Sequence, residues 1–187
     1  DAFPKLKTCL EAGINVITSA EEMAYPQAQS PQLATELDKI AKEHGVTVHG
    51  TGVNPGMMMD LLAICASGIM TQVDKVTCKR VNSLSPFGPI VMHEQGIGES
   101  VENFNARVAN GTMAGHVGFA ESCGAMAEAW GWTIEKFEQQ MSPIVTDVDR
   151  KSPYGFAAAG QVAGVNMTGQ AWVDGEVKLD MYHPQQI

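Results

Sequence analysis

The stretch GTGVNPGMMMDLL, residues 50–62, marks the point where the sequence pattern changes. Its first half holds three glycines with Asn54 and Pro55, a composition typical of a loop whose backbone approaches another group closely. Asn54 is a good helix N-cap and Pro55 suits a first helical turn. The apolar residues that follow predict a buried helix over 57–69. We therefore expect a change of architecture near residue 57.

The residues before this stretch alternate between helical and strand patterns. Leu6 and Leu10 share one helical face, and Gly13 follows as a stop signal. The sequence predicts helices over 4–12 and 31–44, a buried strand over 14–18 and a second short strand over 46–49. Such alternation is typical of an α/β fold with a parallel sheet.

After residue 57 the predicted elements come in blocks, which indicates an α+β domain. Asp174-Gly175, between two β-prone runs, is a strong hairpin signal. The sequence predicts a strand over 73–83, a loop over 85–98, helices over 100–111, 115–130 and 133–141, a loop over 151–164, and the hairpin at 174–175.

Composition narrows the function classes. The formal net charge is -9, and no cluster of Lys and Arg stands out, so we expect no nucleic-acid partner. The apolar run from Met57 to Met70 is broken by Asp60 and Gly68, so we expect no membrane partner. The four cysteines have no CxxC spacing, which favours reduced thiols in a cytoplasmic protein, and the five scattered histidines predict no metal site.

The first candidate site is TSAEEMAYP, residues 18–26, directly after a predicted strand. In open parallel sheets, ligands bind beyond the carboxyl ends of the strands. Thr18, Ser19 and Ala20 are small enough to let a cofactor reach the backbone, and Glu21 and Glu22 place carboxylates beside it. The alternative is a solvated surface pair of glutamates, since such pairs are common.

The second candidate site is the 50–62 stretch itself, which follows the next predicted strand and therefore leaves the same sheet edge. The helix N-terminus at Asn54–Gly56 would offer free N–H groups and the positive end of a helix dipole. The spacing is not the GxGxxG phosphate fingerprint. The alternative is a tight interdomain turn with a methionine core. Cys123 and His116 are better explained as structural residues than as a nucleophile and a base.

GINVITSAEEMAYP, residues 13–26, and GTGVNPGMMMDLL together give a specific resemblance. The chain resembles the 2,4-diaminopentanoate dehydrogenase family, which overlaps the native NAD(P)H-dependent amine dehydrogenases and is similar to dihydrodipicolinate reductase-type enzymes. The resemblance implies that residues 1–56 are the remainder of a dinucleotide-binding Rossmann domain. It implies that residues 57–187 form an α+β substrate-binding and dimerisation domain, truncated at its C-terminus.

The resemblance also implies the site and the reaction. Glu21 or Glu22 would hold the ammonia or amine, and Met57, Met58 and Leu61 would line the substrate pocket. The reaction would be a reversible reductive amination of a ketone or aldehyde by a homodimer with NADP or NAD. The residues expected at the nicotinamide end are Thr18, Ser19, Ala20, Asn54, Pro55 and Gly56.

The chain departs from the family pattern in two respects. The Gly-rich pyrophosphate loop of the Rossmann domain is absent from the sequence, and so is the adjacent-histidine and lysine motif of dihydrodipicolinate reductase. Two alternatives therefore stay open. One is an imine reductase acting on a cyclic substrate, and the other is a non-catalytic substrate and dimerisation fragment of such an enzyme.

Overall fold

The computed structural model describes residues 2–187. Its contacts divide the chain into two units, and strands β8 (Val162–Val173) and β9 (Glu176–Gln186) contribute residues to both. The first unit comprises the residues up to Val76 together with 117–137 and 171–179, and the second comprises the rest. The boundary predicted at residues 56 and 57 rests on sequence and stays a prediction. Within residues 2–187 we find no helix with the length and apolar character needed to cross a membrane.

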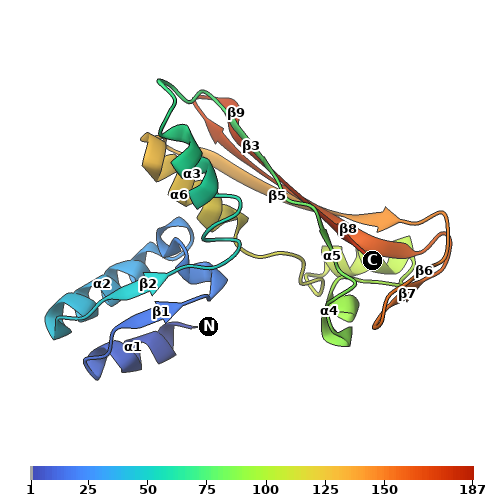
Figure 1. Cartoon of the computed structure of the whole chain (residues 1–187), viewed down its shortest axis with the longest axis horizontal. Coiled ribbons are helices and arrows are strands. Elements are labelled where there is room, and N and C mark those ends of the chain that lie inside the picture. Colours follow the sequence, from blue (N-terminus) through green and yellow to red (C-terminus); the bar gives the residue numbers. More distant parts are fainter. Residues whose placement is uncertain (1) are drawn as a thin grey trace. The chain divides into compact units, whose positions relative to one another are not determined.

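The first unit opens with the predicted helix–strand alternation (Figure 1). Helices α1 (Phe3–Glu11) and α2 (Pro31–His44) alternate with strands β1 (Val16–Thr18) and β2 (Val48–Gly50). The two strands pair in parallel with Val16 opposite Val48, so the α/β prediction for this region is confirmed. Gly45 ends α2 in the left-handed conformation, with φ of 64°.

One face of this two-stranded sheet is covered and the other is open. Leu6 and Leu10 of α1 pack with Leu37 and Ile40 of α2 in a core that Val16 and Val48 join from the strands. Ile17 points away from that core and is 77% exposed. The prediction of a fully buried strand over 14–18 was wrong, because only alternate side chains face the single helical layer.

Two 3₁₀ turns follow β1, and two further helices belong to the first unit. The turns are η1 (Glu21–Met23) and η2 (Pro26–Ala28), and the helices are α3 (Leu61–Ser67) and α6 (Phe119–Trp130). Helix α6 contributes the fully buried side chains of Phe119, Cys123 and Met126. Cys123 is thus a core residue, as expected.

The predicted buried helix over 57–69 was wrong in length and in burial. The helix begins only at Leu61, and none of its residues is buried. Met59, in the turn before it, is the residue that enters the core, with 1% of its surface exposed. The turn over residues 54–60 is stabilised by side-chain hydrogen bonds, described below, that replace the first helical turn.

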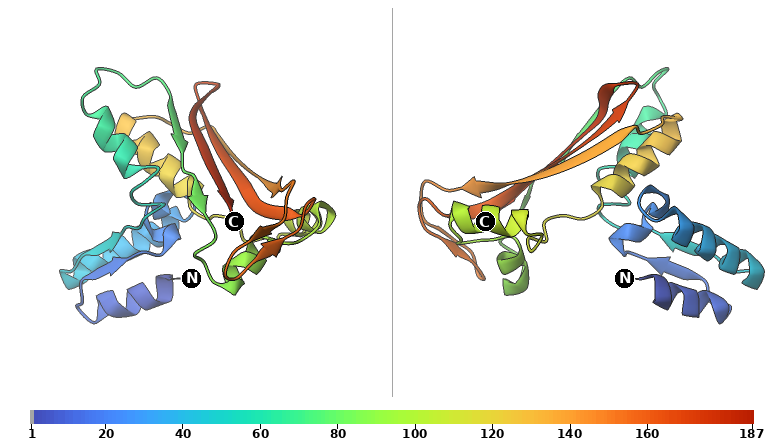
Figure 2. Two further views of the ribbon diagram at one scale, coloured as in Figure 1. Left: turned by 45° about the vertical axis from the view of Figure 1, so that its right-hand side comes forward. Right: turned by 180° about the vertical axis from the view of Figure 1, so that it is seen from behind.

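The long strands form a second sheet with the order β3-β9-β8-β5, and β4 (Asn82–Ser83) pairs with β9 (Figure 2). Strand β3 spans Val76–Lys79. The predicted hairpin is confirmed, because Asp174 and Gly175 join β8 to β9 with φ of 54° and 76°. The second unit contains two helices, α4 (Pro89–Glu94) and α5 (Val101–Ala109), and two short strands, β6 (Arg150–Lys151) and β7 (Phe156–Ala157).

The helix predicted over 133–141 was wrong. The segment is strand β5 (Lys136–Val145), at the end of the sheet order. Phe137 and Met141 are four residues apart, a spacing compatible with either structure, but Pro143 cannot continue a helix and is tolerated in an edge strand. The loop predicted over 85–98 contains α4, and the loop predicted over 151–164 contains β7.

Gly164 permits the close approach of β8 to β9. A Cβ at this position would lie 2.1 Å from the carbonyl oxygen of Gln185. We expect Gly164→Ala to lower the free energy of unfolding by about 2 kcal/mol or more, because the backbone must shift. Gly88→Ala is the control, since a Cβ at Gly88 would meet no atom within 4 Å. Denaturant unfolding of both variants measures the difference, and equal stabilities would contradict the close-approach explanation.

Candidate functional site

The two candidate loops leave the same edge of the parallel strand pair, as predicted. Thr18 and Gly50, the last residues of β1 and β2, lie opposite each other in the register. The backbone N–H of Thr51 donates to the carbonyl oxygen of Thr18 over 2.9 Å. Polar groups that follow β1 and β2 therefore start from one place, where ligands of open α/β sheets bind.

The first loop folds back over β2. The hydroxyl of Thr18 accepts a hydrogen bond from the N–H of Ala20 at 3.1 Å, and Ala20 in turn accepts from Met23 at 2.9 Å. A Cβ on Gly50 would lie 1.6 Å from the carbonyl oxygen of Met23, so the turn carrying Glu21 and Glu22 crosses β2 where no side chain stands. This crossing places the backbone of the turn that carries both glutamates against the end of β2.

Tyr25 attaches the first loop to helix α6. A Cβ on Gly124 would lie 2.7 Å from the ring of Tyr25, so the ring packs directly against the helix backbone. Burial, the larger cause, and the hydrogen bond with Glu128 together raise the pKa of Tyr25 to about 12. The phenol is therefore neutral at physiological pH and acts as an anchor.

The carboxylate of Glu21 lies near two others, those of Glu22 and Glu121. Partial burial is the main cause that raises the pKa of Glu21 above its ordinary value, and the nearby carboxylates of Glu22 and Glu121 raise it further. Each of these effects disfavours the charged form in the absence of a counter-charge. A cation bound beside Glu21 would supply that counter-charge.

The second loop is closed by the buried side chain of Asp60. Its carboxylate accepts from the N–H groups of Gly56 and Leu61, each at 2.6 Å, and from the hydroxyl of Ser122 on α6 at 2.8 Å. Asn54 is buried and precedes a cis peptide bond to Pro55. The loop is therefore a defined structure, held at both ends.

A cavity of about 180 Å³ lies where this loop meets β2. Gly50, Thr51 and Gly56 line it with small side chains and backbone, and Leu61 closes one side. Met57 and Met58 are 45% and 48% exposed, so neither is a core residue. The substrate-lining role assigned to Met57, Met58 and Leu61 stays a prediction.

Glu121 is the residue at this site that the sequence did not point to. It lies in the first turn of α6 with 1% of its surface exposed, and its Oε1 accepts a hydrogen bond from Nε2 of Gln29 at 2.5 Å. Glu121 is 92 positions from Gln29, so only the fold brings the two together. One signal was available, since a glutamate within the apolar run of 117–127 is unusual.

A second buried polar cluster lies in the second unit. The rings of His116 and His183 meet edge to face with centroids 4.7 Å apart, and Nε2 of His183 lies 2.7 Å from Oδ1 of Asn82. Burial lowers the pKa of His116 to about 4 and that of His183 to about 3, with the charge of Arg80 contributing to both. Both imidazoles are therefore neutral at physiological pH.

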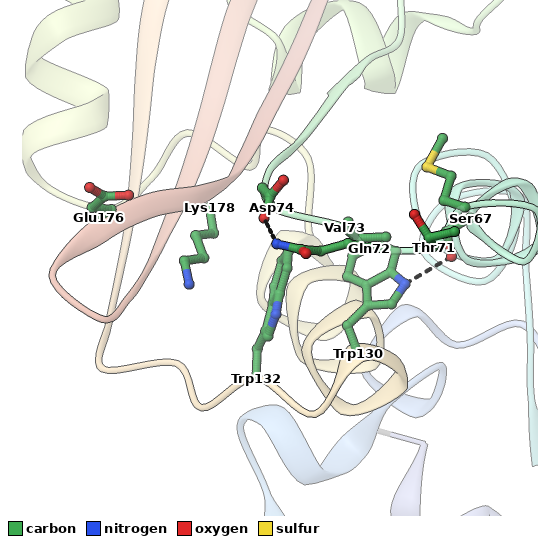
Figure 3. Close-up of a pocket in the computed structure, with 10 residues that line it drawn as sticks. Ser67, Thr71, Gln72, Val73, Asp74, Trp130, Trp132, Glu176 and Lys178 are labelled. Atoms are coloured by element: carbon green, nitrogen blue, oxygen red, sulfur yellow. Dashed lines mark hydrogen bonds between the residues drawn. The ribbon is translucent and has the colours of Figure 1, made fainter.

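A larger cavity, of about 590 Å³, lies in the first unit and is lined by Trp130 and Trp132 (Figure 3). The two indole rings are 5.1 Å apart, and Nε1 of Trp130 donates to the hydroxyl of Ser67 at 2.8 Å. Among the described residues, this larger cavity and the cavity beside Gly50 have no lining residue in common. Among residues 2–187, no group of three or more His, Cys, Asp or Glu side chains is placed to hold a metal ion.

Residues 57–187 match the family model of the 2,4-diaminopentanoate dehydrogenase C-terminal domain. The chain belongs to the 2,4-diaminopentanoate dehydrogenase family. It is 62% identical over 187 residues to 2,4-diaminopentanoate dehydrogenase of Acetoanaerobium sticklandii, a match that covers 100% of this chain and 53% of the relative. The chain thus spans about half the length of that relative.

Solved structures agree with this assignment. The amine dehydrogenase of Mycobacterium smegmatis superposes with a TM-score of 0.80 at 26% identity, covering 100% of this chain and 55% of the other. Biliverdin reductase of Synechocystis gives a TM-score of 0.52 at 13% identity, covering 98% and 49%, which is a likeness of fold alone. The mixed α/β fold is therefore the one seen over about half of the Mycobacterium smegmatis amine dehydrogenase.

Asp60 should account for much of the order in the second loop. We expect Asp60→Ala to lower the free energy of unfolding by about 2–4 kcal/mol, because three donors lose a charged acceptor in a buried place. Ser122→Ala removes one of the three hydrogen bonds and should cost about 1 kcal/mol. Denaturant titration ranks the two variants, and equal costs would contradict a shared three-donor site.

Gly50→Ala should displace the turn that carries Glu21 and Glu22. The added Cβ meets backbone atoms, which cannot rotate away as a flexible side chain would. Backbone amide chemical shifts should change over residues 18–28 more than over α1. Gly13→Ala tests strain without contact, because Gly13 has φ of 74° but open space around it. Unchanged shifts in the 18–28 loop of Gly50→Ala would contradict the crossing.

The buried histidines predict an acid-sensitive fold. The unfolded chain, with an ordinary histidine pKa near 6.5, binds more protons than the folded chain between about pH 6.5 and pH 4, so stability falls as the pH falls through this window. We expect a loss of about 2 kcal/mol between pH 7 and pH 5 for His116. His116→Gln should flatten the measured dependence of unfolding free energy on pH, and an unchanged dependence would contradict the assignment.

Proposed function

We propose that the protein to which this chain belongs is an NAD(P)-dependent amine dehydrogenase. It would interconvert a primary amine with its ketone or aldehyde and ammonia. The observation that carries the proposal is Glu21, a carboxylate with a raised pKa at the carboxyl edge of two parallel strands, beside the loop closed by Asp60. The family and the relative's activity support it.

Glu21 can perform the proton chemistry that such a reaction needs. At neutral pH ammonia is mostly ammonium, which cannot attack a carbonyl. A carboxylate binds the ammonium cation and accepts a proton from it, and a raised pKa makes the carboxylate a better acceptor near neutral pH. When Glu21 returns this proton to the hydroxyl of the carbinolamine, water leaves and the carboxylate regains the negative charge that stabilises the iminium cation.

The cofactor proposed is NADP or NAD, and the loop residues fit its nicotinamide end. The small residues Gly50, Thr51 and Gly56 line part of the cavity at this edge and allow a close approach to the backbone, while His49, Leu61 and Ile64 also line it. The residues that would hold it are Thr18, Ser19, Ala20, Asn54, Pro55 and Gly56. When bound, this cofactor supplies or accepts the hydride. We further propose that residues 1–56 belong to its Rossmann domain, that the protein is a cytoplasmic homodimer, and that Met57, Met58 and Leu61 exclude water from the substrate.

A chimera tests the proposal directly. The 187 residues replace the aligned 53% of the Acetoanaerobium sticklandii relative, whose 62% identity makes the junctions compatible. We expect the chimera to reduce NAD(P) with 2,4-diaminopentanoate. Glu21→Gln should lower kcat/KM by about 100-fold or more, since it removes the proton acceptor while keeping the shape.

Two comparisons make the result specific. Glu22→Gln tests the neighbouring carboxylate, and Glu43→Gln on α2 removes an exposed charge elsewhere. Activity lost with Glu21→Gln and kept with Glu43→Gln supports the role of Glu21. A chimera that folds and binds NADPH but oxidises no amine would overturn the proposal and favour a different reaction or a non-catalytic role.

A further inference from the structure

A cavity of about 380 Å³ lies beside the first loop and carries two carboxylates, those of Glu22 and Glu121. The remaining polar lining includes Gln29, and the apolar lining includes Phe3, Met23 and Leu33. It contains no Lys or Arg among the described residues that line it. The cavity therefore joins a negative end to an apolar wall.

Glu121, at the negative end of the cavity, has an unsatisfied carboxylate oxygen. The side chain is 1% exposed, and Gln29 satisfies only Oε1. Its Oε2 is buried and has no hydrogen-bond partner among residues 2–187. Buried carboxylate oxygens are ordinarily hydrogen-bonded, so this oxygen, on a residue that lines the cavity, is an acceptor without a donor in the described chain.

Glu22 gives the second acceptor. Its Oε1 accepts a hydrogen bond from the backbone N–H of Ala2 at 3.1 Å, which holds the side chain at the cavity. The raised pKa of Glu21, caused in part by Glu22 and Glu121, shows that the three carboxylates share one negative field. A group that donates several N–H bonds and carries a positive charge satisfies this field.

We infer that this cavity is a second amine subsite, in which Glu22 and Glu121 bind a primary ammonium group through its N–H donors. The apolar wall of Phe3 and Leu33 suits the carbon chain of an alkylammonium ion. Among residues 2–187 no group of three or more His, Cys, Asp or Glu side chains has the arrangement that holds a metal ion, so a metal ion is the less suitable occupant.

The subsite gives Glu21 and Glu121 separate tasks. A substrate with two amino groups would place one nitrogen at the reacting centre. Its second nitrogen would then need a carboxylate of the protein to bind it. Glu21 would serve the reacting nitrogen and the Glu22–Glu121 pair the second one. This division rests on the proposed function, whereas cation binding by the cavity does not.

Nuclear magnetic resonance of the 187-residue chain tests the cavity without cofactor or turnover. The side-chain amide of Gln29 is the reporter, because it donates to Glu121. We expect the chemical shifts of this amide to change in a saturable way as ammonium chloride is added. The same saturable change should occur with 1,3-diaminopropane at a lower concentration. Tetramethylammonium chloride, which has no N–H donor, and sodium chloride should give no saturable shift.

Variants locate the binding. Glu121→Gln should weaken 1,3-diaminopropane binding at least 10-fold, and Glu22→Gln at least 3-fold, whereas Glu43→Gln removes the same charge from α2 without effect. Glu22 is exposed, so its variant keeps the test valid if Glu121→Gln does not fold. Equal shifts with sodium, or unchanged binding in both Glu22→Gln and Glu121→Gln, would overturn the inference.

The outcomes also separate this inference from the proposed function. An inactive chimera together with amine binding in the cavity would overturn the dehydrogenase proposal alone. An active chimera together with no amine binding in the cavity would overturn the second subsite alone. In an active chimera, Glu121→Gln should raise KM for the diamino substrate at least 10-fold while the KM for ammonia in the reverse direction changes less.

Discussion

The buried carboxylate of Asp60 is the interaction on which the second loop depends. It receives hydrogen bonds from the loop, from the start of α3 and from Ser122 of α6, so one side chain joins three pieces of chain. A charge removed from water is stable only when its hydrogen bonds are nearly complete. The geometry of Asn54–Gly56 is therefore set by the position of α6, although the loop and α6 are about sixty residues apart in sequence.

Helix α6 supports the first loop in the same way, through a different contact. Tyr25 packs on Gly124 and interacts with Glu128, while Gln29 bonds to Glu121. The short strands β1 and β2 only set where the loops begin. A three-residue strand pair is too small to hold functional groups rigidly, and a helix crossing both loops supplies the rigidity.

The sequence predicted correctly those features that depend on residues close together in the chain. Gly45 and the Asp174-Gly175 turn were recognisable because the chain needs left-handed backbone there, and the departure of the two candidate loops from one sheet edge followed from two parallel strands ending there. Strand β5 was mistaken for a helix because Phe137 and Met141 satisfy both periods, and its pairing with β8 is a long-range choice.

The misjudged burial of residues 57–69 has the same origin. An apolar run indicates that a segment tends to be buried, but it does not show which surface covers it. Helix α3 has no buried residue within the described chain. Glu121 was missed for the converse reason. The role of Glu121 at this site depends on Gln29 and Glu22, which are roughly a hundred residues away in sequence and are brought close by the fold.

The charges at the site follow one consistent logic. Carboxylates repel one another, and bringing Glu21, Glu22 and Glu121 together costs stability unless a cation joins them. Of the three, only Glu121 is buried, and its second oxygen has no donor in the described chain. A purely structural glutamate would be paired with Lys or Arg, which the lining of this cavity lacks. The arrangement is therefore understandable as strain that a positively charged ligand relieves, in the way that functional sites commonly store unfavourable interactions for use on binding.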